Sequence, residues 1–186
     1  SFLTSLAHAA FNVVCVATTT GLVSQNYDLW PVFAPLWMLF LSSIVCSTGS
    51  TGGGIKMFRT LMLMRQAARE MKLLVHPSAM IPVRIGGVVI PDRIAYSVLA
   101  FIFLYFQAIM ALTFLLLLSG MEMVPALSSV VASINNMGPG IGPTGPAGNY
   151  QGLTDFQTWI CTIAMLLGRL EIFSVLILFT AAFWRK

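Results

Sequence analysis

Residues 94–118 (IAYSVLAFIFLYFQAIMALTFLLLL) decide the fold. They form a run of 25 residues without a charged side chain, rich in Leu, Phe and Ile. At about 1.5 Å per residue, a helix of this length crosses the ~30 Å of hydrocarbon in a bilayer with some tilt. The run therefore predicts a transmembrane helix.

The composition of the whole chain supports a membrane setting. Of the 186 residues, 58% are hydrophobic and only 9% are charged, with a mean hydropathy of +0.88. Soluble domains carry roughly a quarter charged residues, so this chain cannot cover a water-facing surface. Cys15, Cys46 and Cys161 lie in apolar stretches without metal-ligand spacing, which predicts buried thiols.

The basic residues are gathered in two places, although the net charge of +4 alone would be compatible with nucleic-acid binding. Seven of the ten Lys/Arg lie between residues 56 and 93, and Arg185 and Lys186 end the sequence. Basic residues on alternate connections follow the positive-inside rule. We therefore expect residues 55–93 and the C-terminus to be cytoplasmic, and nucleic acid is excluded as a partner.

Two further apolar runs are expected to form spanning helices, at residues 29–46 and 153–185. Two more, residues 1–17 and 122–136, are too short to span and stop at clusters of small residues. Short apolar helices that end at Gly-containing turns are typical of re-entrant segments.

These segments form an internal repeat. The order short helix, Gly turn, Asn-Tyr, spanning helix occurs in residues 1–54 and again in residues 122–184. Such a unit is similar to that of a potassium-channel pore, in which backbone carbonyls at the turn surround a dehydrated ion. The turns Thr18–Gly21 and Asn136–Gly140 would then each form one wall of a filter; the alternative is an ordinary loop between helices.

The Gly-rich stretch 47–54 (STGSTGGG) permits several interpretations. A phosphate loop fails because Ile55 separates Gly54 from Lys56 and no strand precedes it. A serine hydrolase motif around Ser50 lacks a base within the membrane. A break in a spanning helix fits best, since irregular backbone at membrane depth occurs where protein or water satisfies it. A simple cytoplasmic helix end remains the alternative.

Arg169 lies inside the last apolar run, where a guanidinium costs about 3 kcal/mol on insertion scales. It should therefore face a polar interior, although an ion pair with Glu171 or another acid is an alternative. The outer acids Asp28, Glu122 and Asp155 could concentrate cations, but we favour solvated loop charges for them.

Four motifs resemble the TrkH/TrkG/KtrB superfamily of potassium channel/transporter subunits: residues 47–56 (STGSTGGGIK), 76–87 (HPSAMIPVRIGG), 135–142 (NNMGPGIG) and 168–173 (GRLEIF). The resemblance covers essentially all of the sequence. It implies an all-α integral membrane fold built from repeats of outer helix, re-entrant pore helix, filter loop and inner helix, four of which surround one pore. The chain is then expected to begin inside a longer protein.

The resemblance divides the chain into parts of two repeats. The third repeat would cover residues 1–75, with pore helix 1–17, filter 18–22, inner helix 29–46, intramembrane gating loop 47–54 and cytoplasmic helix 55–75. A cytoplasmic connection, 76–93, would lead to the fourth repeat, 94–186, with outer helix 94–120, pore helix 122–136, filter 136–140 and inner helix 153–185.

Site residues are implied in the same way. Filter residues would be Thr18, Thr19, Thr20, Gly21 and Leu22 in one turn and Asn136, Met137, Gly138, Pro139 and Gly140 in the other, with K⁺ held at Thr19, Thr20, Gly21, Asn136, Met137 and Gly138. The gate would consist of Ser47, Thr48, Gly49, Ser50, Thr51, Gly52, Gly53, Gly54 and Arg169, with the arginine projecting into the pore.

The function that the resemblance implies is gated potassium permeation in the inner membrane of a bacterium, without enzymatic activity. K⁺ would be the permeant ion and no cofactor would be covalently bound. The implied partners are the remaining repeats, a second copy in a homodimer, the lipid bilayer, and a cytoplasmic ring of Rossmann-type nucleotide-binding subunits (RCK/KTN, TrkA-like). Ion-coupled secondary transport through broken helices is the alternative.

Overall fold

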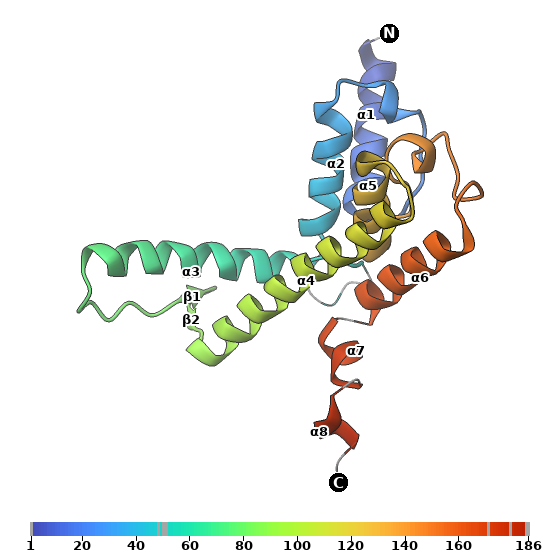
Figure 1. Cartoon of the computed structure of the whole chain (residues 1–186). Helices are drawn as coiled ribbons and strands as arrows, with labels where there is room; N and C mark the ends of the chain where they lie inside the picture. The colour runs from blue at the N-terminus through green and yellow to red at the C-terminus, as the bar shows by residue number, and fades with distance from the viewer. Residues whose placement is uncertain (1, 48, 50–51, 171, 179, 185–186) are drawn as a thin grey trace.

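The computed structural model describes residues 2–47, 49, 52–170, 172–178 and 180–184. Its architecture is mainly helical, as the sequence predicts, and contains two units of related order (Figure 1). The first unit comprises α1 (Phe2–Ala17), the 3-10 helix η1 (Tyr27–Leu29) and α2 (Phe33–Ile44). The second comprises α4 (Asp92–Leu118), α5 (Met123–Ile134), the 3-10 helix η2 (Gly142–Thr144) and α6 (Asp155–Arg169).

The segment between the units contains α3 (Met57–Val75) and a hairpin of two short antiparallel strands, β1 (Arg84–Ile85) and β2 (Val88–Val89). In Figure 1, α3 runs across the direction of α1 and α2 and extends away from them. The short helices α7 (Ile172–Leu178) and α8 (Ala181–Trp184) follow α6.

The long apolar run forms α4, 27 residues that at about 1.5 Å each extend ~40 Å. In the described ranges it is the one helix with the length and composition to cross a membrane. Asp92 in its first turn is favourable to the helix dipole. Gly120 follows the helix with a φ of 87°, a conformation in which a glycine readily ends a helix.

Two inner helices differ from their expected extents. Instead of a helix over 29–46, α2 covers only Phe33–Ile44. It begins after Pro31 and ends because the chain turns back on it: the N–H of Ile55 donates to the Ser43 carbonyl (2.7 Å) and that of Met57 to the Cys46 carbonyl (2.8 Å). These bonds satisfy carbonyl oxygens that a helix end leaves without partners.

The single helix expected over 153–185 is interrupted. α6 ends at Arg169, and Leu170 has a non-helical ψ of 6°, after which α7 begins at Ile172. Gly168, a poor helix former, lies one turn or less before the break and packs directly against the backbone of Ile134. The last inner segment is therefore a broken helix.

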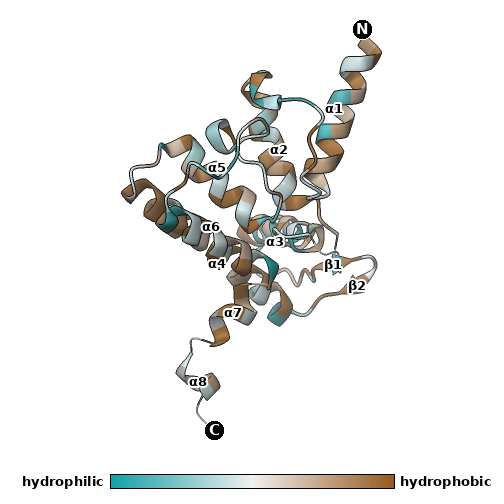
Figure 2. Cartoon of the chain, turned by 90° about the vertical axis from the view of Figure 1, so that its right-hand side faces the viewer, coloured by the Kyte–Doolittle hydropathy of each residue, from teal (hydrophilic) through white to brown (hydrophobic). Residues whose placement is uncertain are grey.

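The main apolar core lies between α4, α5 and α6. A second cluster joins the two units, because Val16, Tyr27 and Met38 from the first pack with Ala132 and Met137 from the second. Outside these cores, many large apolar side chains are exposed on the helices. The hydropathy colours of Figure 2 show that hydrophobic residues occur along most of the helices. Such a surface is suited to lipid or to further protein rather than to water. Cys15, Cys46 and Cys161 are buried and free, which confirms that prediction.

Candidate functional site

The two Gly-containing turns have the same hydrogen-bond pattern. After α5, the Asn136 N–H donates to the Ser133 carbonyl (3.0 Å) and the Met137 N–H donates to the Ala132 carbonyl (2.9 Å). This pair of bonds is the Schellman arrangement that ends a helix with one left-handed residue. Asn136 is that residue, with a φ of 55°.

The turn after α1 repeats this pattern. Its N–H groups at Thr19 and Thr20 donate to the carbonyls of Val16 (3.0 Å) and Cys15 (2.8 Å), and Thr19 has a φ of 54°. A β-branched residue rarely adopts this left-handed conformation, so surrounding contacts must hold it there. The repeat inferred from sequence thus extends to individual backbone bonds.

The two turns lie against each other. Gly21 has a φ of 77°, and a Cβ added to it would lie 2.5 Å from the Met137 carbonyl oxygen and 3.8 Å from the Pro139 Cδ. Only glycine permits this backbone angle and this approach. Gly138 has a φ of 102°, while a Cβ there would meet open space. Residues from turns far apart in sequence therefore form one surface.

The segment after each turn is hydrogen-bonded to the short helix that precedes the turn. The Ser24 N–H donates to Oδ1 of Asn12 in α1 (2.9 Å), and the Ile141 N–H donates to Oγ of Ser128 in α5 (3.0 Å). In the second unit the Tyr150 hydroxyl also donates to the Gly138 carbonyl (2.8 Å). These bonds restrict the orientation of the turns.

Asn135, at the end of α5, joins three helices. Its Nδ2 donates to Oγ of Ser42 (3.0 Å) and of Ser43 (2.9 Å) in α2. Its Oδ1 accepts from the Tyr105 hydroxyl of α4 (2.7 Å). The Asn135 side chain is fully buried, so each of these bonds replaces one that water would otherwise supply.

The Gly-rich loop lies directly beneath this junction. A Cβ on Gly53 would lie 2.6–2.9 Å from backbone atoms of Asn135, and one on Gly54 would lie 2.6 Å from the Ser43 carbonyl oxygen. A Cβ on Gly52 would lie 3.0 Å from Oγ1 of Thr19, in the first turn. Gly52, Gly53 and Gly54 therefore approach both units this closely because they have no side chains.

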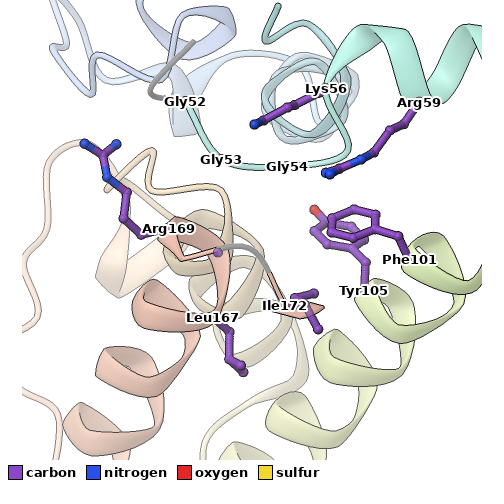
Figure 3. A pocket seen from close by; sticks show the side chains of 11 residues that line it. Gly52, Gly53, Gly54, Lys56, Arg59, Phe101, Tyr105, Leu167, Arg169 and Ile172 are labelled. Atoms are coloured by element: carbon purple, nitrogen blue, oxygen red, sulfur yellow. The ribbon is translucent and has the colours of Figure 1, made fainter. Parts of the chain in front are cut away.

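A cavity of about 220 Å³ lies beside the loop (Figure 3). Gly52–Gly54 form one wall, and the start of α3, α4, the end of α6 and the start of α7 form the others. Among the residues that the structure describes, the charged ones that line it are cationic: Lys56, Arg59 and Arg169. Figure 3 shows Arg169 extending from the end of α6 toward the loop. Arg59 stacks over the Phe101 ring, with Cζ 3.8 Å from the centroid.

The acids Asp28, Glu122 and Asp155 have local roles. Oδ2 of Asp28 accepts from the Gly142 N–H (2.9 Å), which links the two units. Burial raises the pKa of the Asp28 carboxyl above its usual range, and the bond from Gly142 acts in the opposite direction. Asp155 occupies the first turn of α6, which Thr154 and Gln157 begin as a capping box, and Glu122 precedes α5.

The structure thus brings together several residues that the sequence singled out. Gly21, Met137 and Pro139 lie at the contact between the turns, and Gly52–Gly54 and Arg169 border one cavity. Other residues noted in the sequence lie outside the described residues, namely Thr48, Ser50, Thr51, Glu171, Arg185 and Lys186. The sequence alone predicts no role in the site for Asn135, Ser42, Ser43, Tyr105 or Tyr150. Polar residues within apolar runs were the available signal.

Two related units of short helix, Gly turn and second helix, with a membrane-length helix beside them, define a helical membrane protein of the pore-loop class. The model of the family described as "TrkH: Cation transport protein" matches residues 3–186, so the chain belongs to the TrkH cation transport protein family.

Similar proteins carry related names. The chain is 45% identical to the Trk system potassium uptake protein TrkH of Halomonas elongata, over 99% of this chain and 38% of the relative. It is 39% identical to the TrkH protein of Escherichia coli K12, over 100% of this chain and 38% of the relative. The crystal structure of the potassium transporter TrkH from Vibrio parahaemolyticus superposes with a TM-score of 0.92 at 39% identity, covering 100% of this chain and 39% of that one. The chain therefore spans about two fifths of the length of these relatives.

The junction at Asn135 yields a stability prediction. Asn135→Leu in the full-length protein removes three hydrogen bonds, those with the buried hydroxyls of Ser42 and Tyr105 and with the half-buried hydroxyl of Ser43. The two serines keep their bonds to the Leu39 carbonyl, and the loss of the three bonds should lower the unfolding free energy by about 2–4 kcal/mol. Tyr105→Phe removes one bond and should cost about 1 kcal/mol. Thermal unfolding of the purified protein measures both.

Thr113→Val is the matched control, since the Thr113 hydroxyl is buried in α4 without a hydrogen-bond partner in the described structure. Its stability should equal or exceed that of wild type. An Asn135→Leu variant as stable as Thr113→Val would show that the junction is not required.

Proposed function

We propose that the chain forms part of a gated potassium pathway in a bacterial inner membrane. The carrying observation is the contact between two turns of equivalent hydrogen bonding, in which Gly21 lies against the Met137 carbonyl. Ion filters are assembled from backbone carbonyls of several repeats that meet on one axis. Relatives named as potassium uptake proteins support K⁺ as the ion.

In this proposal, residues 18–22 and 136–140 form two walls of the filter, with K⁺ near Thr19, Thr20, Gly21, Asn136, Met137 and Gly138. The remaining walls come from further repeats of the full-length protein. Left-handed residues and glycines let successive carbonyls adopt orientations that ordinary strand or helix backbone does not permit. The bonds from Asn12, Ser128 and Tyr150 support a filter whose geometry is set before the ion enters.

The gate in this proposal combines residues 47–54 with Arg169. The loop lies next to the turns, and a cavity with three cationic residues follows it. Positive charge at low dielectric opposes cation passage, so Arg169 adds an electrostatic barrier where the loop adds a steric one. Movement of the loop away from Asn135 would open the path.

Regulation and assembly follow as further parts of the proposal. Residues 55–93 and the C-terminus face the cytoplasm, where a ring of Rossmann-type nucleotide-binding subunits docks, and the full-length protein forms a homodimer. Ions move down their electrochemical gradient without a coupled second ion. Uptake of radioactive rubidium by liposomes that contain the full-length protein tests whether ions move without a coupled second ion. A requirement for a second ion gradient would favour the coupled transporter.

The filter assignment predicts a loss of selectivity in Gly138→Ala. The new Cβ has room, but an alanine at a φ of 102° carries about 1–3 kcal/mol of strain, so the turn should relax and its carbonyls should move. The ratio of rubidium to sodium flux should fall at least severalfold. Gly120→Ala is the control, since Gly120 also has a positive φ and open space but lies at the end of α4. Unchanged selectivity in Gly138→Ala would remove Gly138 from the filter.

The steric part of the gate predicts increased basal flux in Gly53→Ala, because a Cβ there overlaps the Asn135 backbone and displaces the loop. Rubidium uptake without the regulatory ring should rise severalfold. Gly152→Ala is the matched control, as nothing lies within 4 Å of its Cβ position and its φ is not in the left-handed region. Basal flux equal to that control would contradict loop displacement as the opening step.

The electrostatic part of the proposed gate predicts that Arg169→Ala also raises basal flux. Arg169→Lys keeps the charge, so its basal flux should stay close to that of wild type. One charge acting over several ångströms at intermediate dielectric contributes a barrier of a few kcal/mol, so tenfold or more is expected. The same liposome assay measures it. If Ala and Lys variants behave alike, charge is not the basis of the Arg169 contribution.

A further inference from the structure

A second cationic site lies outside the proposed ion path, between α3 and the segment that leads into the β hairpin. A cavity of about 160 Å³ is lined there by Arg65, Arg69 and Lys72 of α3 and by Arg84 of β1. The three residues of α3 are spaced i, i+4, i+7, so they project from one face of the helix. Ile81, Pro82 and Val83 form the apolar wall of the cavity.

The charges in this cavity are not balanced within the described part of the chain. Arg69 pairs with Asp92, with Nη1 2.7 Å from Oδ1. Arg65, Lys72 and Arg84 have no ion pair or hydrogen bond there through their side chains. Cations held around one small cavity repel each other, and an anion between them relieves that repulsion. The cavity therefore has the chemistry of a phosphate site.

The ion pair also gives the depth of the cavity. Asp92 is the first residue of α4, the membrane-length helix, so its pairing with Arg69 places the cavity level with one end of that helix. The ends of a spanning helix lie where hydrocarbon gives way to lipid headgroups. The cationic residues therefore lie at headgroup depth.

The neighbouring face of α3 is apolar and exposed. Five apolar residues recur at spacings typical of one helix face, and each is at least 40% exposed: Met57, Leu61, Met64, Met71 and Val75. α3 runs across α1 and α2 in Figure 1 and is seen nearly end-on in Figure 2. A helix with a cationic side beside an apolar side, lying across the spanning direction, is typical of the membrane interface.

We propose that this cavity binds the phosphate headgroup of an anionic phospholipid, whose acyl chains lie along the exposed apolar face of α3. Charge complementarity selects an anion, and the apolar face beside it selects a lipid over a free phosphate. The site depends on α4 crossing the bilayer and not on ion selection, so failure of the flux predictions leaves it standing.

The test is the binding of dioleoyl phosphatidylglycerol to the purified full-length protein, counted by native mass spectrometry. Lys72→Gln and Arg84→Gln should each weaken binding about fivefold, the effect of one basic residue at a membrane surface. Arg93→Gln is the matched control, because Arg93 is exposed in the first turn of α4 but does not line the cavity. Phosphatidylcholine should bind all variants alike.

Two further binding measurements identify the ligand. Met71→Gln, on the apolar face, should weaken binding of the lipid, and inorganic phosphate at equal concentration should not displace the lipid. Displacement by inorganic phosphate would make a free anion the ligand and overturn the proposal. Equal lipid binding by wild type, Lys72→Gln and Arg84→Gln would overturn it as well. A loss of dimer or regulatory-ring binding with lipid binding unchanged would assign this face to a protein partner instead.

Discussion

The hydrogen bonds of the Asn135 side chain hold the arrangement together. One buried amide connects α2, α4 and α5, and no water is needed to satisfy it. Polar bonds between helices are valuable in a membrane because lipid offers no partner to a group that loses its own. Since Gly53 packs on the backbone of the same residue, the junction also sets the position of the Gly-rich loop.

The non-helical backbone beside the junction also satisfies its polar groups with hydrogen bonds inside the protein. The loop bonds back to the end of α2 through Ile55 and Met57, so the carbonyls that α2 leaves free find donors. The turns satisfy their own N–H groups through Schellman bonds and are then fastened by side chains of α1 and α5. Irregular segments can therefore lie within a helical membrane protein without exposing polar groups to lipid.

Positive charge is used in two different settings. Beside the loop, Lys56, Arg59 and Arg169 border a cavity among the helices, which we propose is an electrostatic barrier to cations. Along α3, Arg65, Lys72 and Arg84 border a cavity level with the end of α4, which we propose attracts an anionic headgroup. In these two proposals the same residue types oppose a cation at one site and bind an anionic group at the other, and the two sites differ in their depth relative to α4.

The sequence by itself determined the class of fold, because the apolar run of α4 and the repeated order of short helix, Gly turn and second helix are local patterns. It also located the turns, since left-handed backbone favours Gly and Asn. Only the tertiary structure decided where α2 ends, that α6 breaks at Leu170, and that Gly21 meets Met137. The hairpin at 84–89 and the roles of Asn135 and Tyr150 were likewise invisible in the sequence. Each depends on a bond or contact with a distant segment, and the energy of such a contact is not contained in the pattern of neighbouring residues.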